Sequence, residues 1–256
     1  MSSPMRAALI VNPVTQDRPL NLNTAIAMIR EAAGHGANLV LLGEMAFTGM
    51  LNNDDPAHDL PLGESVPGPL SDRLAQEAST LGIWLGFGLL ERDDTRLYDT
   101  AVLLSPTGDV QLQYRRIQPQ WHSRRADPAV YCQGTELPQV ETEFGSLAFM
   151  ICGDLWDDGL RARMRDLRPD WMLYLFARSF SDHARDQARW ESEELPYYAQ
   201  HVADIGVPTL ATSYVCSEVF CEEAEAFGGA MVFDRAGAVA AMQPLDQPGI
   251  LYWNAS

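Results

Sequence analysis

The segment Phe149-Met150-Ile151-Cys152-Gly153-Asp154 ends an apolar run with a cysteine. Residues 147–152 have the length and composition of a buried strand. A free cysteine at such a position is most often a small buried hydrophobic residue. Polar groups at strand ends can also meet in the crevice where α/β folds place their sites. Cys152 becomes a candidate nucleophile if other reactive groups end at the same edge.

Two further predicted strands end in groups of the required kinds. The run at residues 38–42 is followed by Gly43 and Glu44, and Tyr114-Arg115-Arg116-Ile117 closes another strand. A carboxylate, a cation and a thiol could therefore converge. Thiol chemistry needs these partners, because the thiolate is the reactive species and forms beside a base and a positive charge.

The rest of the chain alternates strands with helices. Strands are predicted at residues 6–11, 38–42, 83–89, 98–104, 110–114, 147–152, 171–176, 209–214, 230–233 and 239–242. Helices are predicted at residues 21–33, 69–81, 159–167 and 184–206, the last interrupted near Pro196, while residues 52–62 and 121–134 are loops. This alternation predicts a layered α/β fold in a single domain covering residues 1–256.

Composition narrows the function. The chain has 256 residues and a net charge of −17, which argues against nucleic-acid binding and against a strongly anionic substrate. No stretch reaches the roughly 18 apolar residues of a membrane helix. No signal peptide is evident, so a cytoplasmic location is expected. The five histidines are scattered and there is no CxxC pair, so neither a metal nor a cofactor is predicted.

Three segments, in order, resemble the nitrilase superfamily of carbon–nitrogen hydrolases. They run from Gly36 through Glu44 to Met50, from Met150 to Trp156, and from Phe227 to Gly237. The resemblance covers nearly the whole chain and implies a four-layer αββα sandwich. It also implies a homodimer or higher oligomer, which the apolar residues 250–253 near the end of the chain favour because they would need cover.

The resemblance also implies roles for individual residues. Glu44 would be the general base, and Cys152 would attack a small amide to form a thioester acyl-enzyme. Arg116 falls where the family has its catalytic lysine, and Asp127 falls on the second catalytic glutamate. The backbone N–H of Gly153 would lie in the oxyanion hole, and Trp156 would form part of the pocket wall.

The sequence departs from the family pattern around these residues. Arginine replaces lysine at Arg116, and Gln118, Gly153 and Gly43 stand where the family usually has histidine, a larger or acidic residue, and proline. Arginine keeps the positive charge but never gives up its proton, and it could clamp Glu44 and lower its basicity. The whole chain contains no lysine, so Arg116 is consistent with a general compositional drift.

These departures leave three functions open. The first is a thiol-dependent amidase. The second is a catalytically silent homologue that binds a small amide-like molecule or serves as a scaffold. The third is a cysteine–histidine hydrolase with His183 or His201 as the base, although nothing in the sequence places either histidine near Cys152.

Overall fold

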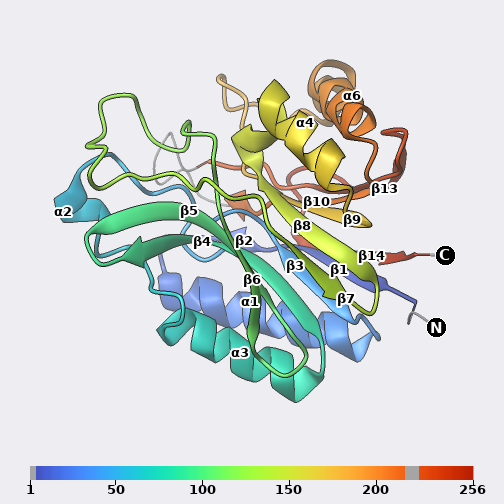
Figure 1. Ribbon diagram of the computed structural model, residues 1–256, viewed down its shortest axis with the longest axis horizontal. Coiled ribbons are helices and arrows are strands. Elements are labelled where there is room, and N and C mark those ends of the chain that lie inside the picture. Colours follow the sequence, from blue (N-terminus) through green and yellow to red (C-terminus); the bar gives the residue numbers. More distant parts are fainter. Residues whose placement is uncertain (1–3, 217–224, 256) are drawn as a thin grey trace.

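The computed structural model describes residues 4–216 and 225–255. Two sheets pack face to face, with helices on both outer faces (Figure 1). Helices α1 (Arg18–Gly34) and α3 (Pro69–Leu81) cover the first sheet, and α4 (Asp158–Leu167) and α6 (Leu195–Ile205) cover the second. The αββα sandwich implied by the resemblance is therefore confirmed.

Each main sheet has six strands. The first contains, in spatial order, β14 (Gly249–Asn254), β1 (Arg6–Val11), β3 (Leu39–Leu42), β4 (Trp84–Asp93), β5 (Arg96–Leu104) and β6 (Val110–Arg115). The second contains β13 (Val239–Gln243), β12 (Ala230–Phe233), β10 (Thr209–Thr212), β9 (Trp171–Leu175), β8 (Gly145–Ile151) and β7 (Gln139–Thr142). The short strands β2 (Pro13–Val14) and β11 (Val215–Cys216) form a separate parallel pair.

Strand direction brings several strand ends to one edge of the sandwich. In the first sheet β1, β3 and β4 are parallel, and two antiparallel steps give β6 the same direction. In the second sheet β8, β9 and β10 are parallel. The carboxyl ends of β3, β6, β8 and β9 precede the segments that carry Glu44, Arg116, Cys152 and Ala177.

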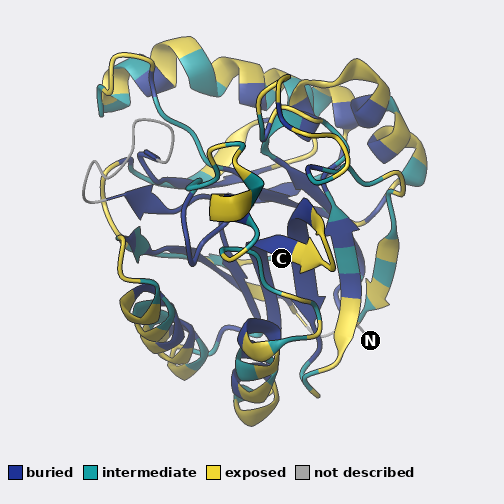
Figure 2. Ribbon diagram, turned by 90° about the vertical axis from the view of Figure 1, so that its left-hand side faces the viewer, coloured by how far each residue is buried: buried dark blue, intermediate teal, exposed yellow. Residues whose placement is uncertain are grey.

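Three apolar layers hold the sandwich together. The inner faces of both sheets form the central layer, which includes Leu41, Phe149 and Leu173. The other two layers lie between each sheet and its helices, and the outward faces of the helices are exposed (Figure 2). Strands buried on both faces explain why the central strands appear as continuous apolar runs in the sequence.

The structure adds detail to two of the predicted segments. The apolar residues at 250–253 lie in β14, which pairs antiparallel with β1, so part of the cover they need is within the chain. The predicted helix at 184–206 is divided into α5 (Gln187–Arg189), a π-helical turn η2 (Trp190–Glu194) and α6. Pro196 lies in the first turn of α6, where its missing N–H costs no hydrogen bond.

The remaining elements are short. The loop predicted at residues 52–62 contains one helical turn, α2 (Pro56–Asp59), and a 3₁₀ turn, η1 (Cys152–Trp156), follows β8. Among the described residues, every helix is too short or too polar to cross a membrane.

Candidate active site

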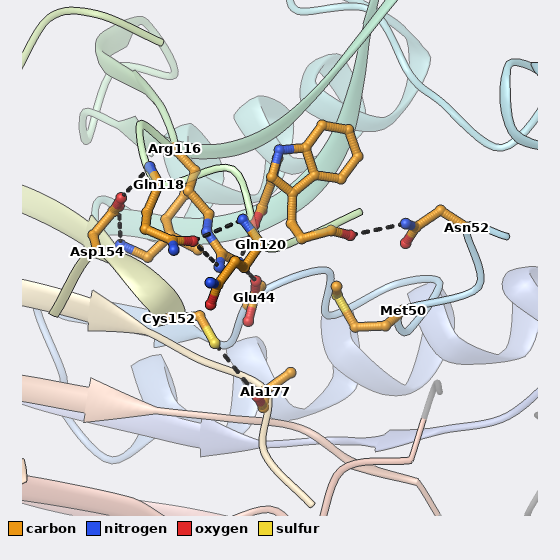
Figure 3. Close-up of polar contacts among 12 residues, drawn as sticks. Glu44, Met50, Asn52, Arg116, Gln118, Gln120, Cys152, Asp154 and Ala177 are labelled. Atoms are coloured by element: carbon orange, nitrogen blue, oxygen red, sulfur yellow. Dashed lines mark hydrogen bonds and ion pairs between the residues drawn. The ribbon is translucent and has the colours of Figure 1, made fainter. Parts of the chain in front are cut away.

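Cys152 occupies a strained turn directly after β8. Its φ of 40° lies in the left-handed region, which a non-glycine residue adopts only when its surroundings hold it there. The Tyr174 hydroxyl donates to the Cys152 carbonyl at 2.8 Å. The Cys152 thiol points to the Ala177 carbonyl, 3.5 Å away, at the end of β9 (Figure 3).

Asp154 anchors this turn to the end of β6. Its Oδ2 accepts from the Tyr114 hydroxyl at 2.7 Å and from the Ile151 N–H at 2.9 Å. Its Oδ1 accepts from the N–H groups of Ile117 at 3.2 Å and Gln118 at 2.9 Å. The buried Asp154 carboxylate thus fixes the segment after Arg116 against the cysteine turn.

Glu44 is completely buried in the turn that follows β3. The preceding residue, Gly43, lies against the backbone of Ser213, and a Cβ there would be 2.7 Å from the Ser213 carbonyl carbon. Glycine at position 43 therefore permits the close approach that aims Glu44 into the site.

Arg116 connects the acidic groups of the site. Its Nη1 donates to Glu44 Oε1 at 3.0 Å and to Asp99 Oδ2 at 3.2 Å, and its Nη2 donates to Gln118 Oε1 at 3.2 Å. The side chain is only 2% exposed. Figure 3 shows Arg116, Glu44 and Cys152 around one space, each from a different segment.

Burial controls the electrostatics of this group. It raises the pKa of Glu44 well above its ordinary value, helped by Cys152 and Asp99 and opposed by Arg116. Burial also raises the pKa of the Asp99 carboxyl, again against Arg116. Burial alone would lower the pKa of Arg116, but the acidic groups around it raise it overall. The guanidinium is the fixed positive charge of the site.

Gly153 and Arg116 are sterically linked. A Cβ at position 153 would lie 2.3 Å from Arg116 Nη2 and 2.7 Å from Gln118 Oε1. Real side chains essentially never come this close, so a larger residue at 153 would have to displace the guanidinium. The departures at Arg116, Gln118 and Gly153 form one arrangement, in which the glycine makes room for the larger cation.

Asp127 does not reach the site, in contrast to the position that the sequence alignment implies for it. Its carboxylate is exposed, and its Oδ1 accepts from the Ala129 N–H at 2.9 Å. Its carbonyl accepts from the N–H groups of Val130 and Tyr131. Asp127 therefore stabilises a turn in the loop after β6. Asp99 is the second acid that bonds Arg116, and its sequence signal is a carboxylate inside the otherwise apolar strand at residues 98–104.

A cavity of about 480 Å³ opens beside the thiol. It is lined by Arg116, Gln120, Cys152, Gly153, Trp156, Ala177, Arg178, Glu194, Tyr197 and Tyr198. Gly153 and Trp156, which the sequence predicts at the site, both line it, whereas Asp127 is not among the lining residues. A second cavity, of about 390 Å³, shares Gln120 and is lined by the loops at residues 50–54 and 120–123.

The histidines of the third alternative do not line this cavity. His183 pairs with Glu225, and His201 packs edge-to-face on Trp156 with ring centroids 4.8 Å apart. Within residues 4–216 and 225–255, no group of three histidine, cysteine or acidic side chains is arranged to hold a metal ion. The chemistry offered by the cavity is that of a thiol, an acid and a fixed cation.

Comparison with known families decides the classification. The carbon–nitrogen hydrolase family model matches residues 6–254. The chain belongs to this family. An aliphatic nitrilase of Sinorhizobium fredii is 30% identical over 175 residues, which cover 62% of this chain and 56% of the relative. An omega-amidase of Xenopus tropicalis is 34% identical over 109 residues, or 42% of this chain and 37% of the relative.

The matches to curated relatives thus cover about half the length of those proteins or less. Solved structures extend the likeness of fold over the whole chain. A carbon–nitrogen hydrolase from Helicobacter pylori has a TM-score of 0.83 at 20% identity, covering 98% of this chain and 89% of the other. A mutant amidase from Nesterenkonia has a TM-score of 0.79 at 20% identity, covering 99% and 91%. That amidase carries the acetamide moiety of fluoroacetamide covalently added at its active-site cysteine.

Proposed function

We propose that this carbon–nitrogen hydrolase is a thiol-dependent amidase with Cys152 as its nucleophile. The observation that carries the proposal is the convergence of Cys152, the buried acid Glu44 and the fixed cation Arg116 from three separate strand ends. Burial raises the pKa of Glu44 and so makes its carboxylate a stronger proton acceptor, as a general base for a thiol requires.

The reaction would have two stages. Glu44 takes the Cys152 proton, and the sulfur attacks the amide carbon. The carbonyl oxygen becomes negative and is stabilised by Arg116 and the Gly153 N–H. The C–N bond then breaks, Glu44 returns the proton to the leaving nitrogen, and a thioester remains. Water, deprotonated by Glu44, attacks the thioester. The C–S bond breaks and Glu44 returns the proton to the sulfur, which releases the carboxylic acid and the free thiol.

The cavity supports a small polar substrate. Its volume of about 480 Å³ is in the lower part of the usual range for ligand sites. Its walls combine the aromatic side chains Trp156 and Tyr197 with the paired charges of Arg178 and Glu194, which are 2.6 Å apart. The amidase from Nesterenkonia, whose cysteine accepts an acetamide moiety, favours simple aliphatic amides as the first substrates to try.

Formation of an adduct on Cys152 tests the proposal. Fluoroacetamide or a small amide should add one acyl- or alkyl-sized mass to wild-type protein and none to Cys152→Ala. Limiting iodoacetamide with peptide mass mapping should label Cys152 faster than the other three cysteines, of which Cys221 lies outside the described residues. Absence of both adduct and amide turnover would leave the silent homologue as the better account.

Two expectations from the sequence stay predictions. They are the homodimer, or a larger assembly of identical chains, and the cytoplasmic location. Sedimentation giving a 28.4 kDa species at low micromolar concentration would contradict the first.

A further inference from the structure

Asp99 is a buried acid to which the reaction above gives no role. It lies on β5 and is only 1% exposed. It is bound to Arg116 twice: its Oδ2 accepts from Nη1 at 3.2 Å, and its backbone carbonyl accepts from the Arg116 N–H at 2.8 Å. The Glu44 and Asp99 carboxyl groups are both bound to the same Arg116 Nη1, at 3.0 and 3.2 Å.

This placement addresses the difficulty that arginine creates for a general base. A guanidinium paired with Glu44 alone would favour the ionised carboxylate and make it a poor acceptor of the thiol proton. In the structure the same Nη1 serves both acids. The formal charges of Arg116 and Asp99 cancel, so Glu44 faces a balanced pair instead of a bare cation.

We propose that Asp99 is a positioning residue that balances the charge of Arg116 and thereby leaves Glu44 able to take the proton of Cys152. The inference rests on the proposed function. It explains how one guanidinium can stabilise an oxyanion without disabling the neighbouring base. Asp99 acts through Arg116 and Glu44 and does not line the cavity.

The charged and titratable groups around Glu44 support this role of Asp99. They come from five elements and are Asp99 on β5, Arg116 after β6, Cys152 at the start of η1, Tyr174 on β9 and Tyr198 on α6. Among those acting on Glu44, Asp99 and Cys152 raise its pKa, and Arg116 lowers it. Asp99 therefore opposes the effect of the cation on Glu44 and takes no part in bond making.

The experiment is the pH dependence of Cys152 alkylation by iodoacetamide, with labelling at Cys152 followed by peptide mass mapping. Asp99→Asn removes the charge and keeps the shape. The site then becomes more positive, Glu44 and Cys152 hold their protons less tightly, and the midpoint should move to lower pH by about one unit. The acid limb of kcat/KM for any accepted amide should move the same way.

Asp93→Asn is the matched control. It removes one negative charge from the same sheet, but the Asp93 side chain is 55% exposed and pairs with Arg115 instead of Arg116. The midpoint of Cys152 alkylation in Asp93→Asn should stay at the wild-type pH. Asp99→Ser is a second charge-free variant and should reproduce the shift if Asp99→Asn does not fold.

The outcomes separate the two proposals. A midpoint that stays in place or rises in a folded Asp99 variant overturns the role of Asp99, and so does failure of both variants to fold, because Asp99 would then be a structural requirement. The alkylation assay needs no substrate, so it reports on Asp99 even if the wild type hydrolyses no amide. Amide turnover without a shift would leave the proposed function standing and remove only the role of Asp99.

Discussion

Two consecutive arginines, Arg115 at the end of β6 and Arg116 directly after it, are each bound to two acids. Arg115 pairs with Glu91 and with Asp93, the latter at 3.0 Å, while its side chain remains 29% exposed. Arg116 pairs with Glu44 and Asp99 and is 2% exposed. Successive side chains of an extended strand point to opposite sides, so this difference follows from one step along the chain.

The comparison shows that burial of the ion pairs, more than the identity of the paired residues, distinguishes the candidate active site from the surface around Arg115. Water partly screens the charges around Arg115, because Arg115 and Asp93 are accessible although Glu91 is buried, and such pairs contribute less than fully buried ones. The charges around Arg116 are withdrawn from water, where they interact strongly and must balance one another. Of the two arginines, Arg116 is the one that interacts with Cys152, so it is the one that can act on the thiol.

The largest difference between the two arginines is expected on replacing Arg116. Arg116→Ala removes a candidate oxyanion donor and should lower kcat/KM for any accepted amide by roughly 100- to 1,000-fold. It also leaves two buried acids without their cation, which should cost about 3–5 kcal/mol of unfolding free energy. Amide turnover and urea denaturation measure the two effects. Turnover at the wild-type rate would exclude Arg116 from the chemistry.

An intermediate effect is expected from Gly153→Ala, which sharpens the comparison because it disturbs Arg116 and its partner Gln118 and leaves Arg115 untouched. The new methyl would meet Arg116 Nη2 at 2.3 Å. Moving the guanidinium by about 1 Å should cost on the order of 100-fold in kcat/KM. The structure also indicates that Arg116→Lys will lower activity, because a lysine cannot make the guanidinium's separate bonds to Gln118 and to the two acids.

A double-mutant cycle tests the linkage directly. A lysine at 116 lacks the planar head that fills the space beside Gly153, so Gly153→Ala should cost less in the Arg116→Lys background than in the wild type. Equal costs in both backgrounds would mean that Gly153 and Arg116 act independently, and would contradict the steric account.

The central fold was predictable because its strands are buried on both faces. Such strands leave continuous apolar runs, as in Leu39–Leu42 and Trp171–Leu175. The edge strand Gln139–Thr142 alternates between exposed and half-buried residues and contains no apolar run, so it was missed. The helix predicted at 184–206 was too long, since hydrophobic spacing alone cannot distinguish a π-helical turn from an α-helical one.

The candidate site was predictable from its place at the ends of strands. Glu44, Arg116 and Cys152 each lie just beyond a predicted strand, and the directions of the strands bring these ends together. Asp127 lies in an irregular loop, where spacing along the chain does not determine which way a side chain points. Asp99 lies inside a strand, and only the structure reveals that its carboxylate meets the guanidinium of Arg116.

The smallest effect is expected on replacing Arg115. Arg115→Ala removes the ion pairs with Glu91 and Asp93 and the stacking of its guanidinium 3.8 Å from the Tyr98 ring centroid. Because Glu91 is itself buried, the loss should exceed that of a surface pair and cost about 1–2 kcal/mol of unfolding free energy. Glu91 keeps the hydrogen bond from the Thr100 hydroxyl at 2.7 Å, which limits the loss of stability.

The β5–β6 pairing uses the Arg115 backbone, not its side chain, so Arg116 should stay in place and kcat/KM should change by about twofold or less. Thermal melting and amide turnover on one preparation give both numbers. A large loss of activity with intact folding would mean that the charge of Arg115 reaches the site through the sheet, and the distinction between an exposed and a buried arginine would then fail.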